Sequence, residues 1–244
     1  MIKNRLPLVL LAVSLSAAAF GQEKKDFPSI SVNGSGEVKA PPDQAIVRLG
    51  VMKEAKTAQQ AQQQVNTAAQ AILDAVRKLG IDPKQIQTSQ LNLYPVYSQG
   101  PVEPMRGEHT PQIVGYQASN VISVTVLNIQ QVGQVIDAGL NAGANQLEGV
   151  LFGLQDDTGA RRQALTKAAA EARAKADTIA EALGVQILWV HEVVESGVSI
   201  QPYVGAREVM MAARADMATP VSPGEVSVSA SLTVRYAIRP PGAR

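Results

Sequence analysis

The spacing of apolar residues along the chain switches between a helical period and a period of two, and these switches predict the elements. Residues 56–79 and 158–183 have apolar positions three and four residues apart, which is typical of one-sided helices. Each stretch runs into a Leu-Gly pair, and glycine commonly ends a helix. A shorter helix is predicted over 129–143. The expected apolar faces are Ala58, Ala61, Val65, Ala68, Ile72, Ala75, Val76 and Leu79 in the first long helix, and Leu165, Ala168, Ala172, Ala176, Ile179 and Leu183 in the second.

Alternation of apolar and polar residues predicts the strands. Pro41-Pro42-Asp43 separates the first two and predicts a turn, so these two strands are expected to form a hairpin. Gly34 and Gly36 interrupt the first strand, which indicates either a β-bulge or a closely packed strand. Residues 98–111 are predicted to form a loop and 196–223 a long irregular insert. The predicted strands are 29–39, 45–52, 85–97, 113–127, 147–154, 186–195 and 225–238.

One order of elements occurs twice along the chain. In both occurrences a long helix and a Leu-Gly pair precede a strand, a proline-bearing loop and a long alternating strand. The sequence identity between the two occurrences is weak, so only the order of elements suggests that the halves are structurally similar. The predicted fold is α+β, with antiparallel sheets packed against two long helices in two similar β-α-β-β-like halves.

The first residues have the layout of a secretory signal peptide. Lys3 and Arg5 precede an almost wholly apolar run, Leu6 to Phe20, and small residues follow before the chain turns polar. An apolar run of about 15 residues is shorter than the roughly 20 that a membrane-spanning helix needs, which disfavours the alternative of an anchor. We therefore expect residues 1–21 to be a cleaved signal peptide and residues 28–240 to form a single exported domain.

Charge and cysteine content exclude several classes of protein. The chain has 22 Lys and Arg and 21 Asp and Glu, so removing Lys3 and Arg5 leaves 20 basic residues against 21 acidic. A nucleic-acid partner is not expected, because such proteins carry a basic excess or a basic stripe. The chain has no cysteine, which excludes disulfides, a thiol nucleophile and an iron–sulfur site.

Gly34-Ser35-Gly36 is a Gly-x-Gly motif of the kind found in phosphate-binding loops, but the sequence that follows it does not fit such a loop. Such loops lead into a helix, whose N-terminal amides face the phosphate. Here the glycines are followed by prolines and another predicted strand. A structural role in the strand is therefore favoured.

The remaining polar residues do not form a recognisable catalytic set. Ser35 lacks the strand-to-helix elbow of a serine hydrolase. His109 and His191 have no partner at metal-ligand spacing, and Asp156 and Asp157 stand where carboxylates complement a helix N-terminus. We accordingly predict no catalytic residue, no metal site and no cofactor.

A methionine-rich stretch lies in the predicted insert. Ala206, Met210, Ala213 and Met217 recur at helical spacing, with Met211 adjacent. Met210, Met211 and Met217 are predicted to form a soft assembly surface for another subunit. Binding of copper(I), scavenging of oxidant and plain core contact are the alternatives.

Several short motifs are spread along the chain. They are Val32-x-Gly34-x-Gly36-x-Val38, Pro42-Asp43-x-Ala45, Leu79-Gly80-Ile81, Thr88-Ser89-x-Leu91-x-Leu93-x-Pro95, Gly115-Tyr116-x-Ala118-x-Asn120 and Leu183-Gly184-Val185. Together they resemble the SIMPL-domain family of exported bacterial proteins, and the resemblance covers the whole mature chain. It implies a periplasmic or surface-associated protein, sometimes named a periplasmic immunogenic protein, that in some members is linked to oxidative-stress defence. It brings no catalytic residue and no cofactor.

The sequence thus predicts a non-enzymatic periplasmic or cell-envelope protein that acts through self-assembly or partner binding. A homo-oligomer, a peripheral association with the outer membrane or envelope, and a part in oxidative-stress defence are expected. The alternative is a metal-dependent or hydrolytic envelope enzyme.

Overall fold

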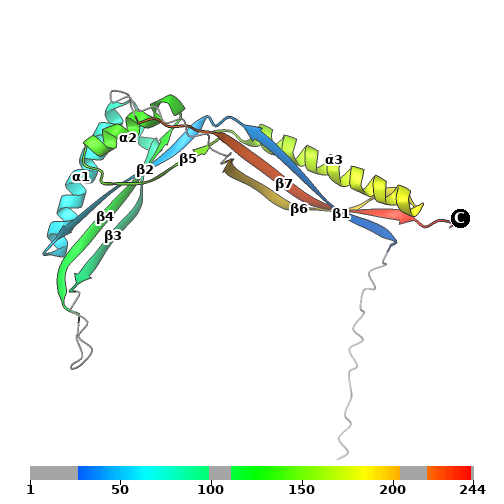
Figure 1. Cartoon of the computed structure of the whole chain (residues 1–244), viewed down its shortest axis with the longest axis horizontal. Helices are drawn as coiled ribbons and strands as arrows, with labels where there is room; N and C mark the ends of the chain where they lie inside the picture. The colour runs from blue at the N-terminus through cyan, green and yellow to red at the C-terminus, as the bar shows by residue number, and fades with distance from the viewer. Residues whose placement is uncertain (1–26, 99–110, 204–218, 243–244) are drawn as a thin grey trace, which may run out of the picture.

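The structure is a computed structural model that describes residues 27–98, 111–203 and 219–242. Two lobes lie end to end in an arch (Figure 1), and every strand pairing in both is antiparallel. The four-stranded lobe has strand order β3-β4-β2-β5, and the three-stranded lobe has order β1-β7-β6. The predicted α+β class with antiparallel sheets is confirmed. The two lobes differ in their numbers of strands and helices, so the expected repeat of similar halves is not confirmed.

The four-stranded lobe packs two helices against one face of its sheet. Helix α1 lies over β2 and β4, while α2 lies beside α1 and β2. Apolar residues alternate along β2, where Val47, Leu49 and Val51 are fully buried against α1 residues such as Val65 and Ile72. The elements of this lobe are β2 (Gln44–Ala55), α1 (Ala58–Lys78), β3 (Ile86–Tyr97), β4 (Ile113–Val126), α2 (Val132–Asn141), β5 (Gln146–Gly153) and short 3₁₀ turns at Pro83–Gln85 and Ile129–Gln131.

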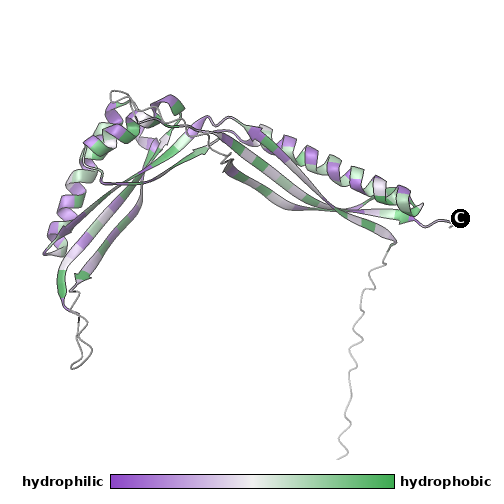
Figure 2. Ribbon diagram, in the orientation of Figure 1, coloured by the Kyte–Doolittle hydropathy of each residue, from purple (hydrophilic) through white to green (hydrophobic). Residues whose placement is uncertain are grey.

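The three-stranded lobe is built from both ends of the described chain and one long helix. Helix α3 covers β1 and β7 on one face and leaves β6 mostly uncovered. Figure 2 shows hydrophobic and hydrophilic residues alternating along these strands, as expected for a sheet with one covered face. The elements of this lobe are β1 (Ser29–Ala40), α3 (Thr158–Leu183), β6 (Gln186–Tyr203) and β7 (Glu225–Arg239).

The predicted hairpin between the first two strands is wrong. Strand β1 pairs with β7, from Ser29 opposite Ala237 to Ala40 opposite Val226, whereas β2 lies between β4 and β5. The turn at Pro41-Pro42-Asp43 carries the chain from one lobe to the other. There the backbone N–H of Asp43 donates to the carbonyl of Gly153, so the turn is held by the end of β5.

The predicted insert also begins later than expected. Strand β6 continues to Tyr203, so Ser196 to Tyr203 is strand and not irregular chain. Gly197 has a φ of 107°, next to a shift in the register between β6 and β7. A glycine-containing bulge lets the strand continue past this position, whereas the sequence pattern is broken there.

The predicted helices are found, but the buried face of α3 differs from the prediction. Its buried residues are alanines at every fourth position, whereas Ile179 is exposed and Leu183 is 61% exposed. Ala168, Ala172 and Ala176 are buried as predicted. None of the helices in the described ranges is long and apolar enough to cross a membrane.

Candidate functional site

The two glycines of β1 lie directly beneath α3. A Cβ atom added at Gly34 would lie 2.0 Å from the carbonyl oxygen of Ala168, and one at Gly36 would lie 2.1 Å from that of Ala164. Only glycine permits this approach of strand and helix. The β1–β7 register is continuous through both positions, so the bulge is wrong and the closely packed strand is confirmed.

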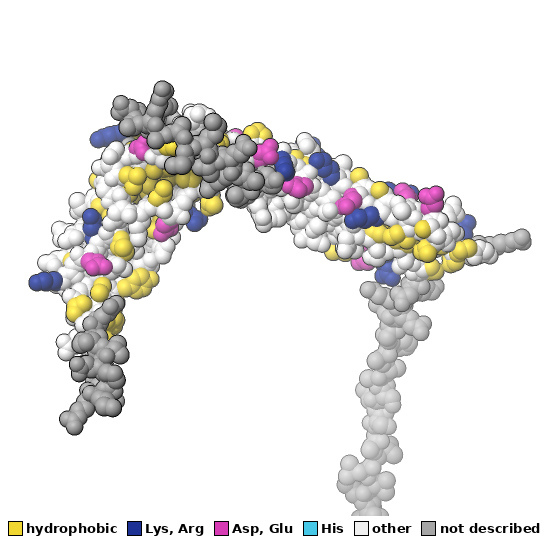
Figure 3. All heavy atoms as spheres, viewed as in Figure 1, with side chains coloured by type: hydrophobic (Ala, Val, Ile, Leu, Met, Phe, Trp, Pro, Cys, Tyr) yellow, Lys and Arg dark blue, Asp and Glu magenta, His cyan; other side chains and the backbone are white. Residues whose placement is uncertain are grey.

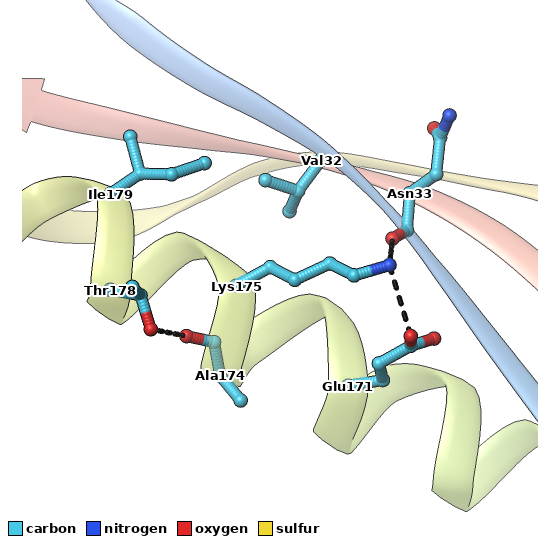
Figure 4. Close-up of a pocket in the computed structure, with 7 residues that line it drawn as sticks. All are labelled: Val32, Asn33, Glu171, Ala174, Lys175, Thr178 and Ile179. Atoms are coloured by element: carbon cyan, nitrogen blue, oxygen red, sulfur yellow. Dashed lines mark hydrogen bonds and ion pairs between the residues drawn. The ribbon is translucent and has the colours of Figure 1, made fainter.

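A polar clamp joins β1 to the flank of α3. The Glu171 carboxylate accepts hydrogen bonds from the backbone N–H of Ser35 and from its hydroxyl, the latter at 2.8 Å. Lys175 Nζ lies 3.0 Å from Glu171 Oε1 and donates to the carbonyl of Asn33 at 3.0 Å (Figure 4). Further along, Lys167 Nζ donates to the carbonyl of Glu37 at 2.8 Å. The helix is thus fixed in register on the strand at three carbonyl or amide groups.

The clamp holds Glu171 in its ionised form. The backbone N–H of Ser35 lowers the pKa of Glu171 most, and Lys175 and the Ser35 hydroxyl lower it further, to about 2. A carboxylate with so low a pKa is a poor proton donor near neutral pH. Ser35 donates its hydroxyl to this carboxylate and has no histidine beside it among the described residues. The group is therefore an anchor between helix and strand.

The other polar residues considered as candidates, Asp156, Asp157 and His191, make contacts that explain their positions structurally. Asp156 Oδ1 accepts from the backbone N–H of Thr158 at 2.9 Å, at the start of α3, as expected of a residue at a helix N-terminus. Asp157 forms an ion pair with Arg161 at 2.7 Å, and the Arg161 hydrogen bond is the main cause of its lowered pKa. His191 is exposed on β6 and contacts the ring of Phe27.

The structure brings no sequence-predicted candidates together as a metal site. Within the described ranges, no three or more His, Asp or Glu residues are close enough to hold a metal ion. His109, Met210, Met211 and Met217 lie outside those ranges, so the predicted methionine surface stays a prediction.

A feature that sequence reasoning missed is the apolar edge of the four-stranded lobe. Strand β3 is the edge strand, and α1 leaves it mostly uncovered. Large apolar side chains are therefore exposed, and Figure 3 shows hydrophobic atoms gathered at the free end of this lobe. We call this surface the β3 edge, and it comprises Leu91, Leu93, Tyr94 and Tyr97 of β3 with Ile113 and Val114 of β4.

The comparisons with known proteins agree with the resemblance seen in the motifs. Residues 30–236 match the family described as "SIMPL: Protein of unknown function (DUF541)". The chain belongs to the SIMPL family. The match covers both lobes, from β1 to β7, so the SIMPL unit includes the glycine strand, the clamp and the β3 edge.

Relatives of this SIMPL-family chain have non-enzymatic or uninformative names. It is 32% identical over 237 residues to the "26 kDa periplasmic immunogenic protein" of Brucella melitensis, covering 95% of this chain and 94% of the relative. It is 27% identical over 183 residues to "Uncharacterized protein YggE" of Edwardsiella ictaluri, covering 75% and 72%. The Escherichia coli K12 protein of that name is 26% identical over 171 residues, covering 68% and 67%.

Proposed function

We propose that this SIMPL-family chain is a non-enzymatic periplasmic protein that acts by self-assembly, with the β3 edge as the surface between two copies. One observation carries the proposal. Strand β3 is twelve residues long, lies at the edge of its sheet, exposes large apolar side chains and contains no charged residue.

An unprotected edge strand is a template for another strand. Its outer side presents unpaired backbone N–H and C=O groups, and natural edges are usually protected by charges, prolines or bulges. In β3 the protection consists of Pro95 and two shifts in register, with no Lys, Arg, Asp or Glu. Antiparallel pairing of two β3 strands around a twofold axis would give a continuous eight-stranded sheet, four strands from each copy.

Side chains on this edge add to the backbone pairing. Leu93 is 43% exposed, and Tyr94 on the opposite face of the strand is also exposed, so pairing would cover apolar area on both faces. Burying apolar surface contributes roughly 25 cal/mol per Å² removed from water. In such a pair, the hydroxyl groups of Tyr94 and Tyr97 could stay in contact with water at the rim, as is common for tyrosines at protein interfaces.

Two observations support a periplasmic location. The residues before Phe27 have the charge and hydrophobicity layout of a signal peptide. The Brucella melitensis relative, which this chain matches over 95% of its length, is named as a periplasmic protein. An outer-membrane association and a role in oxidative-stress defence are proposals that follow from the family resemblance.

The assembly proposal is tested by placing a charge on the β3 edge. The exported chain is expected to have a mass above that of one protomer at micromolar concentration, measured by size-exclusion chromatography with light scattering. Leu93→Lys is expected to lower that mass, because pairing would bring two unpaired ammonium groups together in an apolar interface. Leu147→Lys is the matched control, since Leu147 on the opposite edge strand β5 is 46% exposed and should leave the mass unchanged.

Two results would contradict the proposal. A strictly monomeric wild-type chain would rule out self-assembly. Equal losses of mass in Leu93→Lys and Leu147→Lys would show that the β3 edge is not the specific surface. Stoichiometric metal in untagged protein would favour the alternative of a metal-dependent enzyme.

A further inference from the structure

A second apolar surface lies at the far end of the three-stranded lobe. Phe27 is 44% exposed and Trp189 is 51% exposed, and their rings meet edge to face with centroids 6.4 Å apart. The His191 ring lies 5.7 Å from that of Phe27. The exposed side chains of Leu183 and Leu188 belong to the same end, where α3 finishes and β6 begins. We call these five residues the aromatic tip.

The aromatic tip is not suited to pairing with another strand. Strand β6 shifts its register with β7 at three places, and it carries Glu192 and Glu195. Bulges and charges are the devices that keep an edge strand from adding a partner. Strand β6 therefore carries charges and one more shift in register than β3, which makes strand pairing less favourable there than at the β3 edge. A partner other than a strand fits the exposed rings better.

The composition of the aromatic tip fits the surface of a lipid bilayer. Tryptophan concentrates at the membrane–water interface, where its ring is buried and its N–H remains near polar headgroups. Phenylalanine and leucine add apolar area that can enter the acyl boundary. The charged residues of β6 and β7 near this end are Glu192, which stands opposite Arg235, and Arg239, which stands opposite Gln186.

Until the expected signal peptide is cleaved, the chain before Phe27 would hold this end of the molecule near the membrane that it crosses. The apolar run Leu6 to Phe20 precedes it, and only residues 21–26 separate the two. Seven residue steps span at most about 25 Å, so while the apolar run remains attached and enters a bilayer, Phe27 stays within that distance of it.

From these observations we propose that the aromatic tip docks shallowly on a lipid bilayer, with Phe27, Trp189 and Leu188 entering the interface. The proposal concerns a different lobe from the β3 edge and does not depend on assembly. Because apolar contacts dominate the docking, phosphatidylcholine vesicles should be sufficient, and high salt should not release the protein.

Trp189 makes the test specific, because it is the single tryptophan of the chain. The exported chain is mixed with phosphatidylcholine vesicles whose acyl chains carry bromine, a quencher of tryptophan fluorescence. The expected result is a shift of Trp189 emission to shorter wavelength together with quenching. Emission that is unchanged at every lipid concentration would overturn the proposal.

Variants that keep the reporter define the surface. Phe27→Ser and Leu188→Ser are each expected to raise the lipid concentration needed for half-maximal quenching about tenfold, the cost of losing one buried apolar side chain. Leu147→Lys is the control, because Leu147 of β5 belongs neither to the aromatic tip nor to the β3 edge, and its quenching should equal that of the wild type. Equal quenching in all variants would overturn the proposal. A shift of Trp189 emission without lipid that grows with protein concentration would also overturn the proposal, because it would show that the aromatic tip contacts a second copy of the chain.

Discussion

Gly34 and Gly36 set the distance between β1 and α3, and the alanines of α3 complete the contact. Each glycine lies against a backbone carbonyl of the helix, so neither helix nor strand can yield locally to a side chain. The sequence marks both glycines as unusual and allows a closely packed strand as one explanation. It cannot identify the partner, because Ala168 is more than 130 residues away and nothing local specifies which helix covers which strand.

Gly34→Ala is expected to destabilise the three-stranded lobe. The new Cβ would lie 2.0 Å from the carbonyl oxygen of Ala168, so α3 would have to move away from β1. Overpacking of this kind typically costs about 1–3 kcal/mol, and backbone contact places this site at the upper end. Chemical denaturation measures the loss of unfolding free energy.

The control is a glycine of α3 with space around it. A Cβ at Gly159 would meet no atom within 4 Å, and alanine is the better helix former. Gly159→Ala should therefore leave the unfolding free energy unchanged or raise it slightly. Equal destabilisation by the two substitutions would contradict the close-packing explanation.

The clamp at Glu171 predicts a dependence of stability on pH. Hydrogen bonds from Ser35 and the Lys175 ammonium hold the pKa of Glu171 near 2 in the folded chain, below its ordinary value of 4.5. A lowered pKa stabilises the folded state above pH 4.5, and the contribution is lost as the pH falls from 4.5 towards 2. The difference in unfolding free energy between wild type and Glu171→Gln should therefore be largest at neutral pH and narrow on acidification.

Glu181→Gln on the same helix is the matched control for this titration. Among the described residues Glu181 has no side-chain hydrogen bond or ion pair, unlike Glu171. Its substitution removes no contact of the folded chain and should leave the unfolding free energy at neutral pH close to that of the wild type. A constant difference for Glu171→Gln between pH 7 and pH 3 would disprove the role of the clamp.

At the scale of elements, local patterns predicted what each segment becomes but not which segments pair. The periods of 3.6 and two located the helices and strands, since they arise within a segment. The hairpin at Pro41-Pro42-Asp43 failed because pairing is decided by which apolar faces match. Strand β1 presents glycines that admit the alanine face of α3, whereas β2 presents Val47 and Leu49 to α1.

Helix α3 shows why a buried face can be misread. Hydrophobicity alone favours Ile179 and Leu183, yet the structure buries Ala164 and Ala180 in their place. Close packing against glycines leaves room only for small side chains, so the largest residues are directed outward. The β3 edge was not predicted for a different reason. Alternation predicts that Leu91 and Leu93 share a face of the strand, but it does not show that a helix leaves this face uncovered.

At the scale of the whole molecule, the two lobes have separate cores. The core of the four-stranded lobe is formed by β2, β4, α1 and α2, and the cores of the three-stranded lobe by β1, β7 and α3. No buried residue is shared between them within the described ranges. Since cooperative unfolding follows contiguous cores, we expect heat to unfold the two lobes in two transitions, measurable by differential scanning calorimetry.

Matched substitutions assign each transition to its lobe. Leu49→Ala should lower one transition and Leu232→Ala the other, because Leu49 is buried in the four-stranded lobe and Leu232 in the three-stranded lobe. A buried Leu→Ala change costs about 2–5 kcal/mol, which in a lobe of this size shifts the midpoint of its thermal transition by about 10 °C or more. A single transition lowered equally by both substitutions would instead mean that the lobes unfold as one cooperative unit.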